Sequence, residues 1–297
     1  MASEQLHESG IYLHWLRVPS SADSLSEISL IPRKLSTPAP EPATPTCIHH
    51  KDSRNIIVCI DGTSNKFGED NTNIVKLYAD ILKGDEHGQH AYYSSGIGTS
   101  PDKKSFTGIQ RKISDSLDMA IAWNLEEIVK DAYAWLANEY KKGDRIFLFG
   151  FSRGAYQVRV LAGMIHEVGL ITSRTEKQIA TAYEHYTALR KKKPQSFEIA
   201  REFKRTFSHK DLRLHFIGVW DTVSSVGVIR GDPFPSTSAS GSHACHFRHA
   251  LALDEYRVKF LPEYFGEINS AQQGNDVKEV WFAGSHSDVF VPLKMSR

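Results

Sequence analysis

A serine held between two glycines is the strongest chemical signal in this sequence. Gly150-Phe151-Ser152-Arg153-Gly154 follows the apolar run Ile146–Phe149 and precedes a helix-compatible stretch, Ala155–Leu170. A strand, a G-x-S-x-G turn and a helix together expose a serine hydroxyl as a nucleophile. The turn is so tight that both flanking positions need glycine, and the first N–H groups of the helix point at an oxyanion formed beside the serine. Ser152 is therefore the candidate nucleophile, and the N–H of Arg153 is a candidate oxyanion donor.

An acid and a base follow two later apolar runs. Asp221 comes directly after Arg213–Trp220, and His286 follows Lys278–Ala283. Because catalytic groups of open α/β sheets gather at the carboxyl ends of the strands, we expect both side chains beside Ser152. The chain order Ser, Asp, His is that of α/β-hydrolases. The histidine would take the serine proton, and the carboxylate would orient the imidazole.

Both assignments have plainer alternatives. Asp221 is also suited to cap the backbone after its strand, and His286 to be an ordinary surface histidine. If Asp221 only caps its strand, Asp254 or Asp288 becomes the candidate acid.

The turn Asp61-Gly62-Thr63 follows the first predicted strand and has two functional interpretations. D-G-T suggests a haloacid dehalogenase phosphatase, but that chemistry needs a second aspartate at the position of Cys59, so we reject this interpretation. The other is that the N–H groups of Gly62 and Thr63 face Ser152 and complete an oxyanion hole. An ordinary strand–loop turn remains the alternative.

The charge balance and the hydropathy pattern exclude several classes of partner. With 36 basic and 35 acidic residues, the net charge is +1. No overall field therefore favours nucleic acid or an anionic membrane surface. The segment Met1–His14 lacks the pattern of a secretory signal, and no apolar stretch reaches the length of a membrane span. We expect a soluble, cytoplasmic protein that touches membrane surfaces at most transiently, and the oligomeric state stays open.

The cysteine pattern predicts neither disulfides nor a metal centre. The chain has 3 cysteines, which are widely spaced and form no C-x-x-C motif. This pattern fits free thiols in a reducing compartment. Cys245 lies between histidines in His243-Ala244-Cys245-His246, but this tract lacks the second pair of ligands that zinc needs. The sequence thus predicts no metal and no organic cofactor.

The chain divides into an N-terminal extension and one folded domain. Residues 1–52 are rich in serine and proline and are expected to be disordered, whereas residues 53–297 form the domain. Residues 174–206 are highly charged, with helical apolar spacing broken at Pro194, and predict a helical insertion. The predicted strands are Asn55–Ile60, Ala91–Ser94, Ile146–Phe149, Arg213–Trp220 and Lys278–Ala283, and the predicted helices are Asn73–Lys83, Ser114–Tyr140, Ala155–Leu170 and Phe247–Asp254. This alternation predicts an α/β fold with a mainly parallel sheet and helices on both faces.

A series of motifs makes the prediction more specific. In chain order they are Ile60–Asn65, Thr72–Ile74, Tyr92–Thr99, Gly150–Ala155, Gly218–Val223, His249–Glu255 and Val280–Val289. From about residue 54 to 289 the chain therefore resembles the DUF2235 family of α/β-hydrolase domains, whose bacterial members include phospholipase effectors of the type VI secretion system. The resemblance implies an α/β-hydrolase fold and a serine esterase or lipase activity, with Ser152 as nucleophile and His286 as base. It supports Asp221 as the acid less directly.

The C-terminal segment departs from the family pattern. In the family, the histidine motif continues into a glycine-rich stretch, approximately D-V-G-G-G-Y, and then into further helices. Here Asp288-Val289 is followed by Phe290–Arg297, where the sequence stops. We therefore expect a C-terminally truncated domain in which the loop that carries His286 is poorly fixed, so that a compact chain hydrolyses its substrate weakly.

Two hypotheses follow for the function. The leading one is a serine hydrolase that cleaves carboxylic esters, with a phospholipase- or lipase-like activity on a lipid or small ester substrate. The alternative is a weakly active or inactive interaction protein with a hydrolase fold, because of the C-terminal departure.

Overall fold

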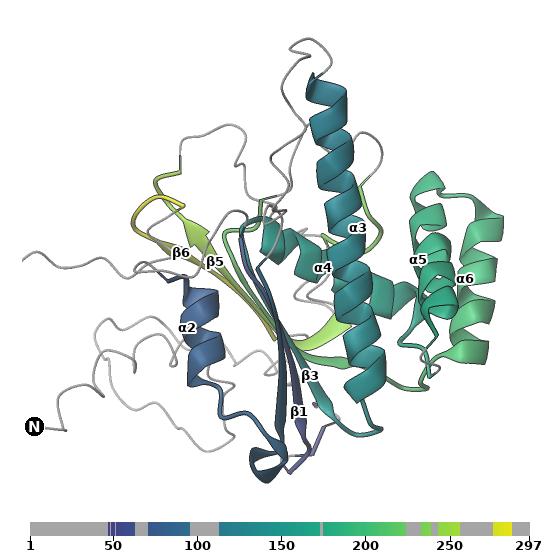
Figure 1. The fold of residues 1–297 in the computed structure, drawn as a ribbon, viewed down its shortest axis with the longest axis horizontal. Helices are drawn as coiled ribbons and strands as arrows, with labels where there is room; N and C mark the ends of the chain where they lie inside the picture. Colours follow the sequence, from purple (N-terminus) through teal and green to yellow (C-terminus); the bar gives the residue numbers. More distant parts are fainter. Residues whose placement is uncertain are drawn as a thin grey trace, which may run out of the picture.

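A six-stranded parallel sheet forms the centre of the molecule, with the strand order β2-β1-β3-β4-β5-β6 (Figure 1). The computed structural model describes residues 47, 49–50, 52–62, 71–95, 113–172, 175–223, 233–238, 243–255 and 276–286. The strands are β1 Asn55–Ile60, β2 Gln89–Ser94, β3 Arg145–Phe151, β4 Leu214–Trp220, β5 Ala244–Ala252 and β6 Asp276–Phe282. The helices are α2 Asn73–Asp80, α3 Ile113–Glu139, α4 Arg153–Val168, α5 Glu176–Ala188 and α6 Pro194–Phe207, with short 3-10 turns at Asp85–His87 and Leu189–Lys191. The predicted α/β fold with a mainly parallel sheet is confirmed.

Each face of the sheet has its own apolar core. On β1, Ile56 and Val58 pack in the core shared with α3, α4, α5 and α6, whereas Ile57 and Cys59 pack with Ile74 of α2. Successive side chains of a strand point to opposite faces, so a strand that is apolar at every position must be covered on both sides. Figure 1 shows α2 on one side of the sheet and α3 and α4 on the other, with α5 and α6 outside them. Helices therefore cover both faces, as predicted.

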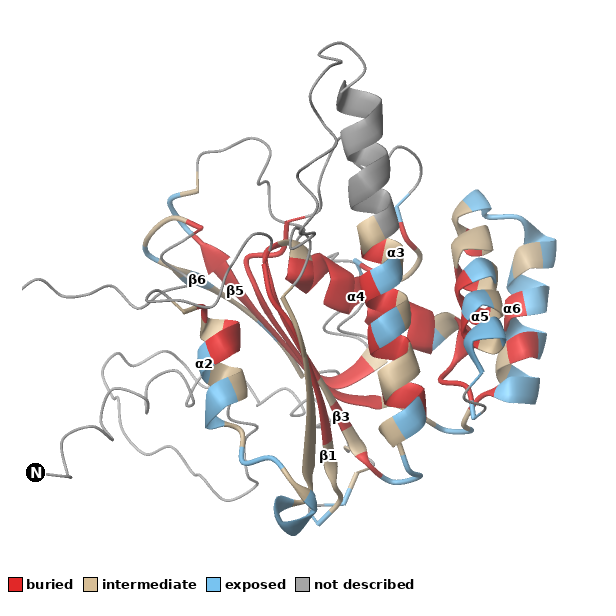
Figure 2. Cartoon of the chain, in the orientation of Figure 1, coloured by how far each residue is buried: buried red, intermediate tan, exposed pale blue. Residues whose placement is uncertain are grey.

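Helix α4 is the innermost helix. All of its residues from Gly154 to Ile165 are buried, because β3 lies on one side and α3, α5 and α6 lie on others (Figure 2). The segment predicted to be a helical insertion contains α5 and α6, and Pro194 stands at the first turn of α6, where its missing N–H costs no hydrogen bond. The turn that precedes α4 is therefore anchored by a helix that is buried in the core.

One predicted element is wrong. The segment Phe247–Asp254 was expected to be a helix, but residues Ala244–Ala252 form strand β5 between β4 and β6. All nine positions of β5 are buried, because Arg248 and His249 also enter the interior and bind the carboxylates of Asp276 and Glu279 on β6. The partners of Arg248 and His249 lie on β6, so the sequence of this segment alone does not show that it is a strand.

Several expectations fall outside the described residues. They include residues 1–46, Thr63, Asp288 and the segment that follows His286. The boundary of the N-terminal extension and the effect of the C-terminal departure thus stay predictions. Among the described helices, none combines the length and the apolar character needed to cross a membrane.

Candidate active site

The candidate catalytic residues lie where the winding of the sheet reverses. From β1 the chain passes to β2 on one side and then crosses back to β3 on the other side of β1. In open α/β sheets, ligands bind at the carboxyl ends of the strands beside such a reversal. Asp61 directly follows β1 and Ser152 directly follows β3, so both stand at this position.

The backbone at Ser152 forms a sharp turn between β3 and α4. Ser152 has φ 56° and ψ −122°, a conformation that a non-glycine residue adopts only when its surroundings impose it. A Cβ at Gly150 would lie 2.6 Å from the carbonyl oxygen of Gly154, and a Cβ at Gly154 would lie 2.3 Å from the carbonyl oxygen of Asp61. Both glycines are therefore required by backbone contacts.

Ser152, His286 and Asp221 form a chain of short contacts. His286 Nε2 lies 2.8 Å from Ser152 Oγ, and His286 Nδ1 lies 2.5 Å from Asp221 Oδ2. All three residues are buried, with exposed fractions of 5% for Ser152, 1% for Asp221 and 6% for His286. Three residues from distant parts of the sequence thus meet at one edge of the sheet, with the imidazole between the hydroxyl and the carboxylate.

Asp221 is oriented by backbone contacts on strand β5. Its N–H donates to the carbonyl of Ala250 at 2.7 Å, and its Oδ1 accepts the N–H of Ala252 at 3.1 Å. The backbone has φ 39° at Asp221, which turns the chain away from β4. Because one carboxylate oxygen is held by β5, the other faces His286.

The loop that carries His286 is attached to the loop after β5. The N–H of Gly284 donates to Asp254 Oδ2 at 2.8 Å, and the N–H of His286 donates to Glu255 Oε2 at 3.2 Å. The ring of Phe151 stacks on the imidazole of His286, with centroids 4.8 Å apart. Asp254, one of the two alternative acids, therefore binds backbone, and the imidazole faces Asp221 instead.

A buried histidine near Asp221 was not recognised from the sequence. His249 Nε2 accepts the N–H of Thr222 at 3.3 Å, so its proton is on Nδ1, which lies 2.9 Å from Glu279 Oε1. Burial lowers the pKa of His249 although the hydrogen bond to Glu279 favours the protonated form. Its neutral ring supports the turn just after Asp221. The motif His249–Glu255 was part of the family resemblance, but only the pairing of β5 with β6 shows what this histidine contacts.

Asp61 holds the loop after β1 together. Its Oδ1 accepts the N–H of Gly62 at 2.6 Å, and its Oδ2 accepts the hydroxyl of Thr72 at 2.8 Å and that of Tyr93 at 3.1 Å. Thr72 is also the N-cap of α2, where its hydroxyl oxygen accepts the N–H of Val75. Burial and the nearby Asp61 carboxylate raise the pKa of Tyr93.

These contacts bear on the three candidate oxyanion donors. The N–H of Gly62 is engaged with Asp61 in this structure, and Thr63 lies outside the described residues. Arg153 is the first residue of α4, so its N–H has no acceptor within the helix and stands beside Ser152.

Comparison with known proteins identifies the family of the chain. Residues 54–291, a range that includes Ser152, Asp221 and His286, match the family described as type VI secretion system (T6SS) phospholipase effector, Tle1-like, catalytic domain. The uncharacterized protein YEL023C of Saccharomyces cerevisiae is 39% identical over 224 residues, which are 71% of this chain and 33% of that protein. The chain thus spans about a third of the length of this relative. Because the match covers most of the folded domain, the chain belongs to the family of Tle1-like phospholipase effector catalytic domains, which is the DUF2235 family.

Proposed function

We propose that this protein is a serine hydrolase that cleaves carboxylic esters, with phospholipids as the leading substrate class. The observation that carries the proposal is the hydrogen-bonded chain from Ser152 through His286 to Asp221. The substrate class rests on the family, whose description names a phospholipase effector.

In the proposed mechanism His286 transfers one proton in each half of the reaction. Ser152 Oγ attacks the ester carbonyl carbon while His286 Nε2 takes the hydroxyl proton. The bond to the leaving alcohol then breaks, and the alcohol receives that proton from the imidazolium. A water molecule then attacks the acyl-enzyme while His286 takes one of its protons; the bond to Ser152 Oγ breaks, the imidazolium returns that proton to Oγ, and the carboxylic acid leaves. Asp221 stabilises the imidazolium and fixes the tautomer.

The negative charge that forms on the carbonyl oxygen needs donors at the start of α4. The N–H of Arg153 is the first donor in our proposal, because it lies at the positive end of a well-packed helix. Gly62 and Thr63 are proposed as the second source. For Gly62, this requires that its N–H turn from Asp61 Oδ1 to the substrate when the substrate binds. The mechanism uses no metal ion and no organic cofactor.

The setting of the reaction is also a proposal. None of the cysteines Cys47, Cys59 and Cys245 forms a disulfide, which fits a reducing compartment such as the cytoplasm. Since the active-site edge must receive a lipid, we propose that the protein contacts membrane surfaces transiently.

Hydrolysis of phospholipid vesicles and of short-chain nitrophenyl esters tests the proposal. We expect the Ser152→Ala variant to lose at least ~10³-fold in kcat, while its Tm stays close to that of the wild type. Ser196→Ala, on α6, is the matched control and should keep wild-type turnover. Equal turnover in the Ser152→Ala variant contradicts the proposal. A folded wild type that hydrolyses neither substrate class favours the alternative, an inactive interaction protein.

A further inference from the structure

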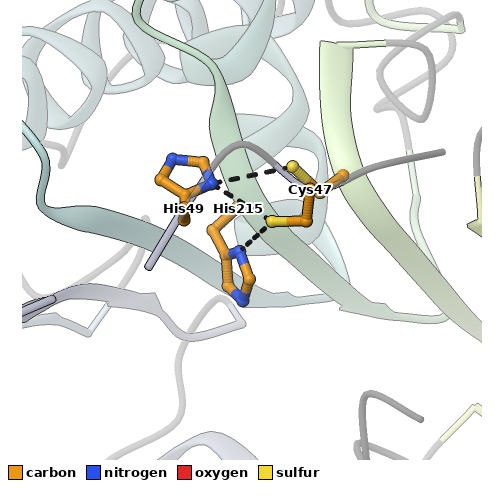
Figure 3. Close-up of side chains that lie close together, drawn as sticks. Cys47, His49 and His215 are labelled. Atoms are coloured by element: carbon orange, nitrogen blue, oxygen red, sulfur yellow. Dashed lines mark hydrogen bonds between the residues drawn. The ribbon is translucent and has the colours of Figure 1, made fainter. Parts of the chain in front are cut away.

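Four potential metal ligands meet far from the candidate active site. Cys47, His49, His215 and Cys245 each place one ligand atom within 4.8 Å of those of the others. Figure 3 shows the side chains of Cys47, His49 and His215 directed toward one another. Cys47 and His49 precede β1, while His215 and Cys245 lie at the beginnings of β4 and β5. The cluster is defined by these four residues.

The cluster lies at the edge of the sheet opposite to Ser152. All strands are parallel, so the beginnings of β4 and β5 are at the amino edge and the catalytic candidates are at the carboxyl edge. The extended chain from His215 to Asp221 covers roughly 20 Å at about 3.3 Å per residue. No group of the cluster can therefore touch an ester bound at Ser152.

Three of the distances between the donor atoms are close to those around one tetrahedral metal ion, and all four atoms lie within 4.8 Å of one another. Cys47 Sγ lies 3.3 Å from His49 Nδ1 and 3.2 Å from His215 Nδ1, and Cys245 Sγ lies 3.7 Å from His49 Nδ1. Tetrahedral zinc with Zn–S of about 2.3 Å and Zn–N of about 2.0–2.1 Å keeps its ligand atoms roughly 3.3–3.8 Å apart. The two imidazoles meet edge to face, with centroids 5.1 Å apart and an interplanar angle of 82°, so both present their Nδ1 atoms from different directions.

The positions of the ligands also suit a structural ion. His215 and Cys245 are buried, with exposed fractions of 7% and 2%, so an ion bound between them would be shielded from water. The His49 ring also hydrogen-bonds the backbone of Arg213, the kind of outer contact that orients a ligating histidine.

From the donor set and its geometry, we propose that Cys47, His49, His215 and Cys245 bind one structural Zn²⁺ ion. Two sulfur and two nitrogen donors in a tetrahedron are typical of zinc, and four protein ligands leave no open position for substrate. Binding releases one proton from each thiol. The ion ties the segment before β1 to β4 and β5, which are separated from β1 by β3 in the sheet. Its role is to hold the segment before β1 against the amino edge of the sheet.

A disulfide between Cys47 and Cys245 is the competing state of the same residues. It would oxidise both thiols, use neither histidine and leave no site for the ion. The two states are therefore distinguished by metal content and by the mass of the peptides that contain the cysteines.

The test measures zinc in the full chain, purified without a histidine tag and under reducing conditions. We expect about one Zn²⁺ per chain by mass spectrometry of the metal, and near-complete loss in Cys47→Ser and in Cys245→Ser. Cys59→Ala is the matched control, because Cys59 is buried on β1 outside the cluster, and it should keep its zinc. Removing the ion from the wild type with a chelator should lower the Tm, and adding Zn²⁺ back should restore it.

A spectroscopic measurement keeps the proposal testable if the cysteine variants do not fold. Co²⁺ added to the zinc-free wild type should give the intense visible bands of a tetrahedral site and thiolate-to-metal charge transfer, and Zn²⁺ should abolish both. A wild type that binds neither metal, that carries the Cys47–Cys245 disulfide, or that shows an octahedral cobalt spectrum without charge transfer overturns the proposal. Equal loss of zinc in Cys59→Ala does so as well.

Discussion

Ser152 and Asp221 both have positive φ angles, and both directly follow a strand. Such angles cost roughly 1–3 kcal/mol at a non-glycine residue, so surrounding contacts must impose them. The N–H of Ser152 donates to the carbonyl of Trp220, the residue before Asp221, and the carbonyl of Ser152 accepts the N–H of Val223. The turn at Ser152 and the turn at Asp221 therefore hold each other in place.

The contact between Asp221 and His286 leads to the first prediction. Asp221→Asn keeps the shape of the side chain but removes its charge, and it allows the wrong imidazole tautomer. We expect kcat to fall by roughly 10³–10⁴-fold with little change in KM or Tm. The matched control is Asp254→Asn, whose side-chain oxygen can still accept the N–H of Gly284. Steady-state kinetics of both variants measure the two losses in kcat. A larger loss in Asp254→Asn than in Asp221→Asn would show that the assignment of the acid role to Asp221 is wrong.

At the scale of elements, the turn between β3 and α4 brings the helix against the loop after β1. The closeness of this packing is clear from the space at Gly154, where an added Cβ would lie 2.4 Å from the carbonyl oxygen of Ile60 and 2.3 Å from that of Asp61. These are backbone atoms, which cannot rotate away. The start of α4 and the Asp61 loop are consequently one packed unit.

Gly154→Ala tests this packing. We expect a loss of about 1–3 kcal/mol or more in the free energy of unfolding, measured by denaturant titration, because the helix must move away from the Asp61 loop. Activity should fall in the folded fraction, since the same shift moves Arg153. Gly88→Ala is the control, because an added methyl there meets no atom within 4 Å and costs only backbone strain. Wild-type stability and turnover in Gly154→Ala would refute the packing argument.

Elements that a local pattern encodes were predictable from the sequence, and those that depend on distant partners were not. The run Asn55–Ile60 has an apolar residue at nearly every position, and its predicted bounds are those of β1. The geometry of the G-x-S-x-G turn was predictable because the two glycines that the turn requires lie within five residues of sequence. Strand β5 was misread because its buried Arg248 finds Asp276 only across the sheet.

The cluster of four potential metal ligands was not predicted from the sequence, for the same physical reason. The sequence around Cys245 offers one plausible ligand group, and its partners come from two other places in the chain, the segment with Cys47 and His49 and the strand with His215. His246, which is adjacent in sequence, contacts Asp276 instead. Only the parallel register of β4 with β5 brings His215 and Cys245 to the same edge.

At the scale of the whole molecule, histidines that burial keeps neutral link stability to pH. His243 and His166 stack with ring centroids 3.5 Å apart. Burial, followed by the charges of His166 and Lys204, lowers the pKa of His243 from 6.5 to about 3. Below pH 6.5 the unfolded chain therefore takes up a proton at this residue that the folded chain does not bind until about pH 3.

The folded state should thus lose stability as the pH falls from 6.5 toward 3. One such histidine contributes at most about 1.4 kcal/mol per pH unit to the free energy of unfolding. Denaturant titrations at several pH values in this range measure the slope. His243→Gln cannot titrate and should show a shallower slope than the wild type, whereas identical slopes would show that His243 does not set the acid sensitivity.

The central claim is that Ser152 is activated by His286, and covalent labelling with a fluorophosphonate probe measures this most directly. The probe reacts with a serine hydroxyl only when a base removes its proton, and it does not depend on knowing the substrate. The account predicts one adduct per chain, located at Ser152 by peptide mass spectrometry. It also predicts that labelling is absent in Ser152→Ala and strongly slowed in His286→Ala, while Ser196→Ala labels like the wild type. A folded wild type that is not labelled, an adduct on another residue, or an unchanged rate in His286→Ala would contradict the account.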